Sequence, residues 1–166
     1  MYDQLFKAFL KSGSVSIDTR TIQKGDIFFG LKGEKYDGNT YVMQALKKGA
    51  SLAITDDPVN KNIPGTMLVP DSLQALQRLA SEYRKQIKIP VIGITGSNGK
   101  TTTKELIYHV LKQKFIVFAT QGNLNNHIGV PLSILAVKKE NEIAIIEMGA
   151  NHIGEIRLLC NIAKPT

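Results

Sequence analysis

The sequence has no tryptophan, a single cysteine and no long apolar run. Cys160 has no second cysteine with which to form an internal disulfide, and it cannot supply a zinc cluster. No apolar run approaches the ~18 residues that a membrane-spanning helix needs. The start, Met1-Tyr2-Asp3-Gln4, lacks the basic stretch and apolar core of a secretory signal. These absences predict a soluble, cytoplasmic protein without a membrane span.

The length and composition are those of an ordinary globular protein. The chain has 166 residues, of which 43% are hydrophobic and 21% charged, and these values exclude wholesale disorder. At roughly 150 residues per domain, this length corresponds to one ordinary domain or two small ones.

Basic residues outnumber acidic ones, with 21 Lys and Arg against 14 Asp and Glu, a net charge of +7. They occur as singles and pairs, without the dense block or interleaved aromatics of a nucleic-acid binder. We therefore expect no nucleic-acid partner. The surplus indicates either a solvated basic surface or a field that attracts small phosphorylated anions.

Strand and helix patterns alternate along the chain, which predicts an α/β fold. In the first half we expect strands at 15–17, 26–31, 51–55 and 66–69, and helices at 40–48 and 71–86. In the second half we expect strands at 91–95, 115–119 and 143–147, and helices after the glycine-rich loop, at 128–137 and at the end.

The segment Ile87-Lys88-Ile89-Pro90 is the expected domain boundary, which gives domains of residues 1–86 and 87–166. Beyond it, the continuous apolar run 91–95 is typical of a parallel strand covered on both faces. The helix after the glycine-rich loop is expected to group its apolar residues on one side, namely Leu106, Ile107, Val110 and Leu111.

A glycine-rich loop with a lysine and a threonine lies between this strand and helix. It reads Gly96-Ser97-Asn98-Gly99-Lys100-Thr101. Glycine lets main-chain N–H groups turn toward an anion, and the helix N-terminus adds ~0.3–1 kcal/mol. Micromolar nucleotide binding takes roughly 8 kcal/mol, so the site also needs Lys100 on the phosphates and Mg²⁺ on Thr101.

The loop departs from the common G-x-x-x-x-G-K-[ST] pattern, since the residue six before Lys100 is Ile94. Its alternative interpretation is a strand-to-helix turn that binds nothing. Thr102 and Thr103 either support the phosphate site or serve the first turn of the helix. Lys104 is expected to be an exposed helix lysine.

The segment from Gln121 to Gly129 follows the next strand and is rich in amides. The carboxyl ends of parallel strands share one sheet edge, where open α/β sheets bind ligands. Unpaired amides are costly to bury, so these side chains either cap turns or face a polar ligand.

Glu147 ends the apolar strand 143–147 at the same edge, where it either holds Mg²⁺ or caps the following turn. His152 either contacts a ligand or caps the last helix. We interpret His109 as structural and Cys160 as a small core residue.

Three segments together resemble the Mur ligases of peptidoglycan synthesis: the loop 96–101, Asn123-Leu124-Asn125-Asn126, and Glu147-Met148-Gly149-Ala150-Asn151-His152. The first half resembles the uridine-nucleotide-binding domain of that family through residues 16–20, 25–28, 31–33 and 37–39. The resemblance covers nearly the whole chain.

The resemblance implies a small α/β UDP-binding domain followed by the first part of a parallel-sheet ATPase domain with a phosphate loop. It implies an ATP-dependent amide ligase that adds D-alanyl-D-alanine to UDP-N-acetylmuramoyl-tripeptide through an acyl phosphate. The alternatives are another Mur-type ligase or a non-catalytic UDP-sugar or nucleotide-binding module. The segments Asp18-Thr19-Arg20 and Lys32-Gly33 disfavour a folylpolyglutamate-synthase-like protein, since that branch lacks a comparable UDP-binding domain.

Residue roles follow from the resemblance alone. ATP would contact the loop and the start of its helix, at Gly96, Ser97, Asn98, Gly99, Lys100, Thr101 and Thr102. The catalytic residues would be Lys100 and Glu147. Thr101 and Glu147 would hold Mg²⁺. The UDP-muramoyl-peptide or phosphates would contact Asp18, Thr19, Arg20, Lys32, Gly33, Asn123, Asn125, Asn126 and His152.

The family has three domains, and only about half of this chain follows Pro90. We therefore expect a truncated form that does not ligate alone. We also expect it to expose apolar surface and to self-associate.

Overall fold

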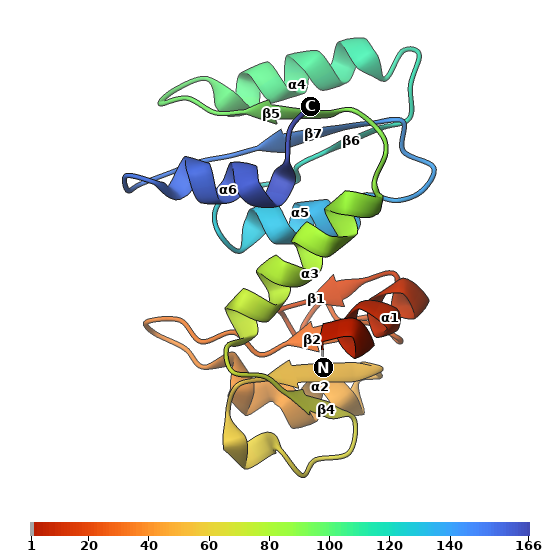
Figure 1. The fold of residues 1–166 in the computed structure, drawn as a ribbon, viewed down its shortest axis with the longest axis vertical. Helices are drawn as coiled ribbons and strands as arrows, with labels where there is room; N and C mark the ends of the chain where they lie inside the picture. Colours follow the sequence, from red (N-terminus) through yellow and green to blue (C-terminus); the bar gives the residue numbers. More distant parts are fainter. Residues whose placement is uncertain (1) are drawn as a thin grey trace. The chain divides into compact units, whose positions relative to one another are not determined.

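The computed structural model describes residues 2–166, which divide between Leu79 and Ala80 into two compact units. The division lies inside the long helix α3 (Ser72–Gln86), whose two ends therefore belong to different units. Each unit has its own parallel sheet (Figure 1). This confirms the predicted α/β fold class with parallel sheets.

The first unit contains a four-stranded parallel sheet in the order β1-β2-β3-β4. Its strands are β1 (Val15–Ser16), β2 (Ile27–Phe29), β3 (Leu52–Thr55) and β4 (Thr66–Leu68). Its helical elements are α1 (Tyr2–Ser12), η1 (Gly38–Tyr41), α2 (Val42–Lys47) and η2 (Pro58–Asn60).

All three residues of β2 are buried, as expected for a parallel strand covered on both faces. Phe28 packs with Ala53 of β3 against Val42 and Ala45 of α2, and these four residues form one core cluster. Helix α1 contacts β2 and contributes Leu5 and Phe9 to the buried set.

The second unit contains a three-stranded parallel sheet in the order β5-β7-β6. Its elements are β5 (Val91–Ile94), α4 (Lys100–Leu111), β6 (Val117–Ala119), α5 (Gly129–Ala136), β7 (Ile143–Glu147) and α6 (Glu155–Ala163). Helix α4 lies on one face of this sheet, and α5 and α6 lie on the other (Figure 1). The central strand β7 is therefore covered on both sides.

The structure contains the predicted strands and helices, with three differences. The first difference is helix α1, which the sequence analysis does not predict. The predicted helix at 40–48 divides into η1 and α2, because the Asp37 side chain accepts a hydrogen bond from the Asn39 N–H and starts the chain in a 3₁₀ turn. Helix α3 begins as predicted, with Asp71 accepting from the Gln74 N–H at 2.8 Å.

The third difference is the buried face of α4. Leu106 and Val110 are 65% and 71% exposed, so the expectation that they pack with Ile107 and Leu111 is wrong. The side chains facing the sheet are Ile107, Leu111 and, one turn earlier, the buried Lys104. Because a lysine occupies part of this face, the apolar pattern alone does not identify the buried side of the helix.

Within residues 2–166, no helix combines the length and the apolar character that crossing a membrane requires.

Candidate functional site

The loop between β5 and α4 is exposed and has a backbone conformation that favours glycine. Gly96 and Gly99 have φ values of +151° and +76°, which L side chains rarely adopt. Gly99 is the N-cap of α4 and has no side chain to satisfy the first N–H groups of the helix. The loop therefore leaves main-chain donors and the positive end of the helix dipole available to an anion.

Lys100 folds back over this loop. Its Nζ donates a hydrogen bond to the Gly96 carbonyl oxygen at 2.6 Å. The ammonium group therefore lies on the same loop whose N–H groups are available, as a phosphate site requires.

Glu147 is the centre of a buried polar cluster at the carboxyl end of β7. It is 2% exposed, and its two oxygens accept from the Thr101 hydroxyl at 3.2 and 3.1 Å. Asn125 Nδ2 donates to Oε1 of Glu147 at 2.9 Å. The sequence predicts Thr101 in the loop, Asn125 in the amide segment and Glu147 at the strand end as separate candidates. The structure brings the three together at the Glu147 carboxylate.

Lys104 belongs to the same cluster, and the expectation that it is an exposed lysine is wrong. It is 3% exposed, and its Nζ donates to the Thr120 carbonyl oxygen at 2.7 Å. The ammonium also lies 4.0 Å from Oε2 of Glu147. The helix turns this position toward the sheet, where a carbonyl and a carboxylate compensate a charge that would otherwise be costly to bury.

The amide segment both caps a helix and contacts the carboxylate. Oδ1 of Asn126 accepts from the N–H groups of Ile128 and Gly129, which start α5. The Asn125 side chain donates to Glu147, and its main-chain carbonyl accepts from the Gly149 N–H at 2.7 Å. Asn123 is exposed.

His152 is exposed just before α6. Its N–H and that of Asn151 donate to the Glu155 carboxylate, and these two hydrogen bonds lower the pKa of Glu155. Sequence reasoning did not find this capping role of Glu155, although an acidic residue at a helix start is a usual signal for it.

The oxygen donors of Thr101 and Glu147 fit Mg²⁺, which is usually bound through one or two carboxylates and substrate phosphates. Across residues 2–166, no group of three or more His, Cys, Asp or Glu side chains is placed to hold a metal ion. A metal held by Glu147 would therefore depend on phosphate oxygens for further ligands.

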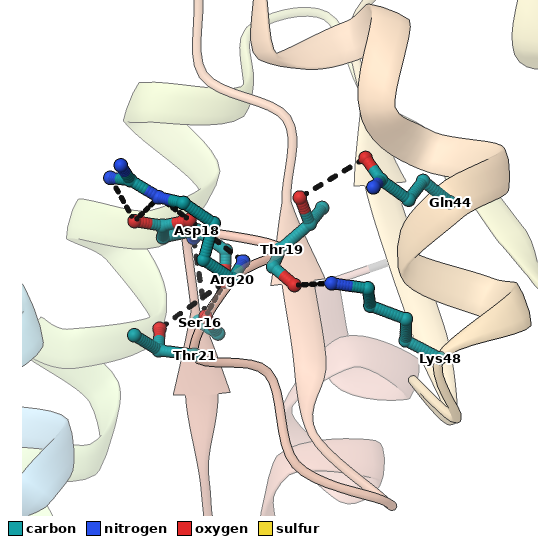
Figure 2. A network of polar contacts seen from close by, with 7 residues as sticks. All are labelled: Ser16, Asp18, Thr19, Arg20, Thr21, Gln44 and Lys48. Atoms are coloured by element: carbon teal, nitrogen blue, oxygen red, sulfur yellow. Dashed lines mark hydrogen bonds and ion pairs between the residues drawn. The ribbon is translucent and has the colours of Figure 1, made fainter.

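In the first unit, Asp18 and Arg20 form an ion pair next to β1 (Figure 2). Arg20 Nη2 lies 2.6 Å from Oδ2 of Asp18, and its Nε contacts both carboxylate oxygens. The hydrogen bonds from Arg20 lower the pKa of Asp18 from 3.8 to about 2. The same pairing raises the pKa of Arg20.

Thr19 connects this turn to α2 (Figure 2). Its hydroxyl donates to Oε1 of Gln44 at 3.2 Å, and its carbonyl accepts from Nζ of Lys48 at 2.7 Å. The turn that carries Asp18 and Arg20 is therefore anchored on a helix.

A cavity of about 520 Å³ opens beside this turn. Its lining residues are Ile17, Asp18, Thr19, Arg20, Phe28, Tyr36, Gly38, Tyr41 and Gln44. Lys32 and Gly33 do not line it, but Gly33 donates to the carbonyl of Tyr36 across the adjacent turn. Sequence reasoning missed Tyr36, Tyr41 and Gln44, because lone aromatic and amide residues carry no motif.

One wall of the cavity is fixed by Asn39, which is 3% exposed. Its Nδ2 donates to Asp37 at 2.9 Å and to Asp56 at 2.7 Å, and its Oδ1 accepts from the Thr55 hydroxyl at 2.7 Å. These bonds hold η1, which carries Gly38 and Tyr41, against the end of β3.

Comparison with known families matches both units to one family. Residues 12–95 match the model described as Mur ligase family, catalytic domain, and residues 94–166 match the Mur ligase middle domain. The chain belongs to the Mur ligase family, which confirms the resemblance predicted from its motifs.

Within the family, the chain is similar to ligases that share one name. The UDP-N-acetylmuramoyl-tripeptide–D-alanyl-D-alanine ligases of Bacillus subtilis and Escherichia coli are 46% and 38% identical over 154 and 152 residues, which is 91% and 92% of this chain. The crystal structure of MurF ligase from Thermotoga maritima in complex with ADP is 40% identical, has a TM-score of 0.83 and covers 94% of this chain.

The chain spans about a third of the length of these relatives, 34% and 33% of the two ligases and 36% of the Thermotoga chain.

Proposed function

We propose that this chain supplies the ATP-binding and UDP-muramoyl-peptide-binding parts of a cytoplasmic ligase. The ligase adds D-alanyl-D-alanine to UDP-N-acetylmuramoyl-tripeptide in peptidoglycan synthesis. The observation that carries the proposal is the glycine loop before α4, with Lys100 over it and Glu147 held beside it by Thr101. The two ligase relatives are named for these substrates, and the ADP bound by the Thermotoga relative supports the nucleotide.

The proposed chemistry requires a site for a polyphosphate. ATP transfers its terminal phosphoryl group to the substrate carboxylate, and the amine of D-alanyl-D-alanine displaces phosphate from the acyl phosphate to form the amide. ADP and phosphate are released. Charge develops on the phosphoryl oxygens during transfer, so fixed donors and cations aimed at them are the main source of rate enhancement.

The N–H groups of the loop would bind the phosphates, at Gly96, Ser97, Asn98 and Gly99. The hydroxyl of Thr102 would bind them as well. Lys100 would neutralise the developing charge. Thr101 and Glu147 would hold Mg²⁺, which when bound neutralises phosphate charge and orients the transferring group. Glu147 is suited to this role because Thr101 and Asn125 fix both of its oxygens.

Asn123, Asn125, Asn126 and His152 remain proposed contacts to substrate or phosphate. Asn123 and His152 are exposed, whereas Asn125 acts on Glu147 and Asn126 caps α5 through its oxygen. The hydrogen bonds of Asn125 and Asn126 support a positioning role, in which they hold Glu147 and the start of α5 in place.

The cavity of the first unit is the proposed site for the uridine diphosphate group. Arg20 supplies a cation for phosphate, and Tyr36 and Tyr41 supply aromatic rings on which a base can stack. Lys32 and Gly33 would act from the adjoining turn. A boundary at residues 86 and 87, self-association and the lack of ligation by this chain alone remain predictions.

Calorimetric titration of the chain tests this assignment. We expect saturable binding of UDP-N-acetylmuramoyl-tripeptide and of UDP, with CDP as a control of the same charge binding more weakly. ADP with Mg²⁺ is expected to bind separately and more weakly than the uridine substrate. A folded sample that binds neither uridine ligand would refute the proposed substrate.

A further inference from the structure

Lys104 is a buried cation that the proposed function does not use. Its ammonium lies 4.0 Å from Oε2 of Glu147, and the two side chains are 4% and 2% exposed. Two opposite charges are thus removed from water together. Such a pair persists only when each charge compensates the other and further hydrogen bonds satisfy both.

Lys104 is also connected to Glu147 through Thr120. The Thr120 carbonyl accepts from Lys104 Nζ at 2.7 Å, and its hydroxyl accepts from the Glu147 N–H at 3.0 Å. Thr101 lies three residues before Lys104, on the same face of α4, and also contacts Glu147. One face of the helix therefore approaches the carboxylate with a hydroxyl and an ammonium group.

The second carboxylate near Lys104 is a weaker partner. Glu105 Oε1 lies 3.1 Å from Nζ, but its side chain is 51% exposed. Solvent screens such a pair, and it contributes little. The partner that shares the buried environment of Lys104 is Glu147.

We propose that Lys104 is the resident counter-ion of Glu147, a positioning residue that balances this carboxylate and sets how tightly the site holds its divalent cation. This inference rests on the proposed function, in which Glu147 helps to hold Mg²⁺ with a nucleotide. A cation that approaches Glu147 gains the attraction of the carboxylate but is repelled by the ammonium 4 Å from it. Removing the Lys104 charge therefore strengthens cation binding, provided that Thr101 and Asn125 still hold the carboxylate.

The test measures ADP binding at increasing Mg²⁺ concentrations in the wild-type chain and in K104M, K104R and E105Q. In K104M, the Mg²⁺ concentration for half-maximal ADP binding falls at least about threefold, because a unit charge near 4 Å acts strongly at a buried site. K104R keeps the charge and E105Q alters only the exposed neighbour, so both remain near the wild-type value. An unchanged or higher Mg²⁺ requirement in K104M, with ADP binding intact, would overturn the inference.

A stability cycle keeps the inference testable if K104M folds poorly. Removing Lys104 leaves Glu147 buried without its cation, so K104M unfolds at lower urea concentration than wild type. In the E147Q background the same substitution shifts the urea midpoint less, and K104M/E147Q folds even if K104M does not. Equal shifts in both backgrounds, or a double variant that stays unfolded while E147Q folds, would refute the pairing.

The two proposals fail in different ways. Absence of ADP binding in the folded wild-type chain contradicts the proposed function, and the stability cycle then decides the Lys104–Glu147 pairing by itself. ADP binding with no effect of K104M on the Mg²⁺ requirement contradicts only the role of Lys104.

Discussion

Asp18 keeps its negative charge at low pH because the guanidinium group of Arg20, and secondly its main-chain N–H, donate hydrogen bonds to the carboxylate. These bonds hold the Asp18 pKa at about 2, below the ordinary value of 3.8. A lowered folded-state pKa means that the stability from this ion pair is fully present above about pH 4 and is lost as the pH falls through about 2. Between pH 5 and 8 the pair does not titrate.

We predict that R20Q raises the carboxyl titration midpoint of Asp18 from about 2 toward ~3.9. The reason is that the substitution removes the guanidinium group that stabilises the charged form. Carboxyl-carbon NMR shifts measured against pH report this midpoint directly. R157Q, in helix α6 of the second unit, serves as the control and should leave the Asp18 curve in place. An Asp18 midpoint that stays near 2 in R20Q would show that another group lowers it.

Arg84 is a buried cation whose hydrogen bonds are made to main-chain carbonyls. It donates to Ala163 and Ile87 at 2.7 Å and to Lys164 at 2.8 Å, and it is 6% exposed. Burial lowers the pKa of Arg84. The guanidinium group joins α3 to the end of α6, where the last carbonyls of the helix need donors.

We predict that R84M lowers the free energy of unfolding by about 2–4 kcal/mol, because three carbonyl oxygens lose their donor. R84K should recover part of the loss, since lysine keeps the charge but lacks the planar fork. Urea unfolding measures the difference. K85M, which removes only an exposed pair with Glu82, should stay within ~0.5 kcal/mol of wild type. A similarly small effect of R84M would show that the three hydrogen bonds of Arg84 do not stabilise the fold.

Among the elements, the start of α5 is the most constrained junction at the site. A Cβ on Gly129 would lie 2.3 Å from the main-chain carbon of Leu124 and 2.4 Å from its Cα. Only glycine lets the amide segment pass this close to the helix. That packing places Asn126 to cap α5 and Asn125 beside Glu147.

We predict that G129A destabilises the chain by about 2 kcal/mol or more, because main-chain atoms must move to accept the methyl group. Helix propensity alone gives the opposite sign, since alanine is favoured over glycine inside a helix by ~1 kcal/mol. Chemical denaturation separates the two expectations. G13A provides a comparison, with open space around its Cβ but a φ of +75°, and should cost about 1 kcal/mol. A neutral or stabilising G129A would show that the close approach is not needed.

The parallel strands and the phosphate loop could be predicted because their signals are local. Apolar runs such as 143–147 are bounded by turn residues, and the loop combines glycines with a Lys-Thr pair at fixed spacing. The burial of Lys104 could not be predicted, because it depends on the Thr120 carbonyl and the Glu147 carboxylate, which lie 16 and 43 residues further along the chain. For the same reason, sequence reasoning could not choose between the capping and ligand roles of Asn125 and Asn126.

The cavity of the first unit shows the same limit. Asp18 to Arg20 could be proposed from a polar turn and a family resemblance. Tyr36, Tyr41 and Gln44 also line that cavity, next to η1, which Asn39 ties to Thr55 at the end of β3. Long-range contacts of this kind leave no periodic trace in the sequence.

At the scale of the whole molecule, the chain has two sheets, each with its own candidate site. The net charge of +7 does not arise in the phosphate cluster, where the two cations Lys100 and Lys104 are matched by the two carboxylates Glu105 and Glu147, both within 4.0 Å of Lys104. The surplus therefore lies elsewhere on the chain and does not identify the ligand. The central claim depends instead on the loop before α4 and its lysine.

That claim is tested most directly by titrating ADP with Mg²⁺ into the wild-type chain, K100M and K112M by calorimetry. Lys112 ends the same helix and is exposed, so its loss is a matched control for charge. The account predicts saturable binding to wild type and K112M, and binding to K100M that is weaker by at least about tenfold, the loss of ~1.4 kcal/mol. Equal affinity of K100M and K112M, or no binding by a folded wild-type chain, would contradict it.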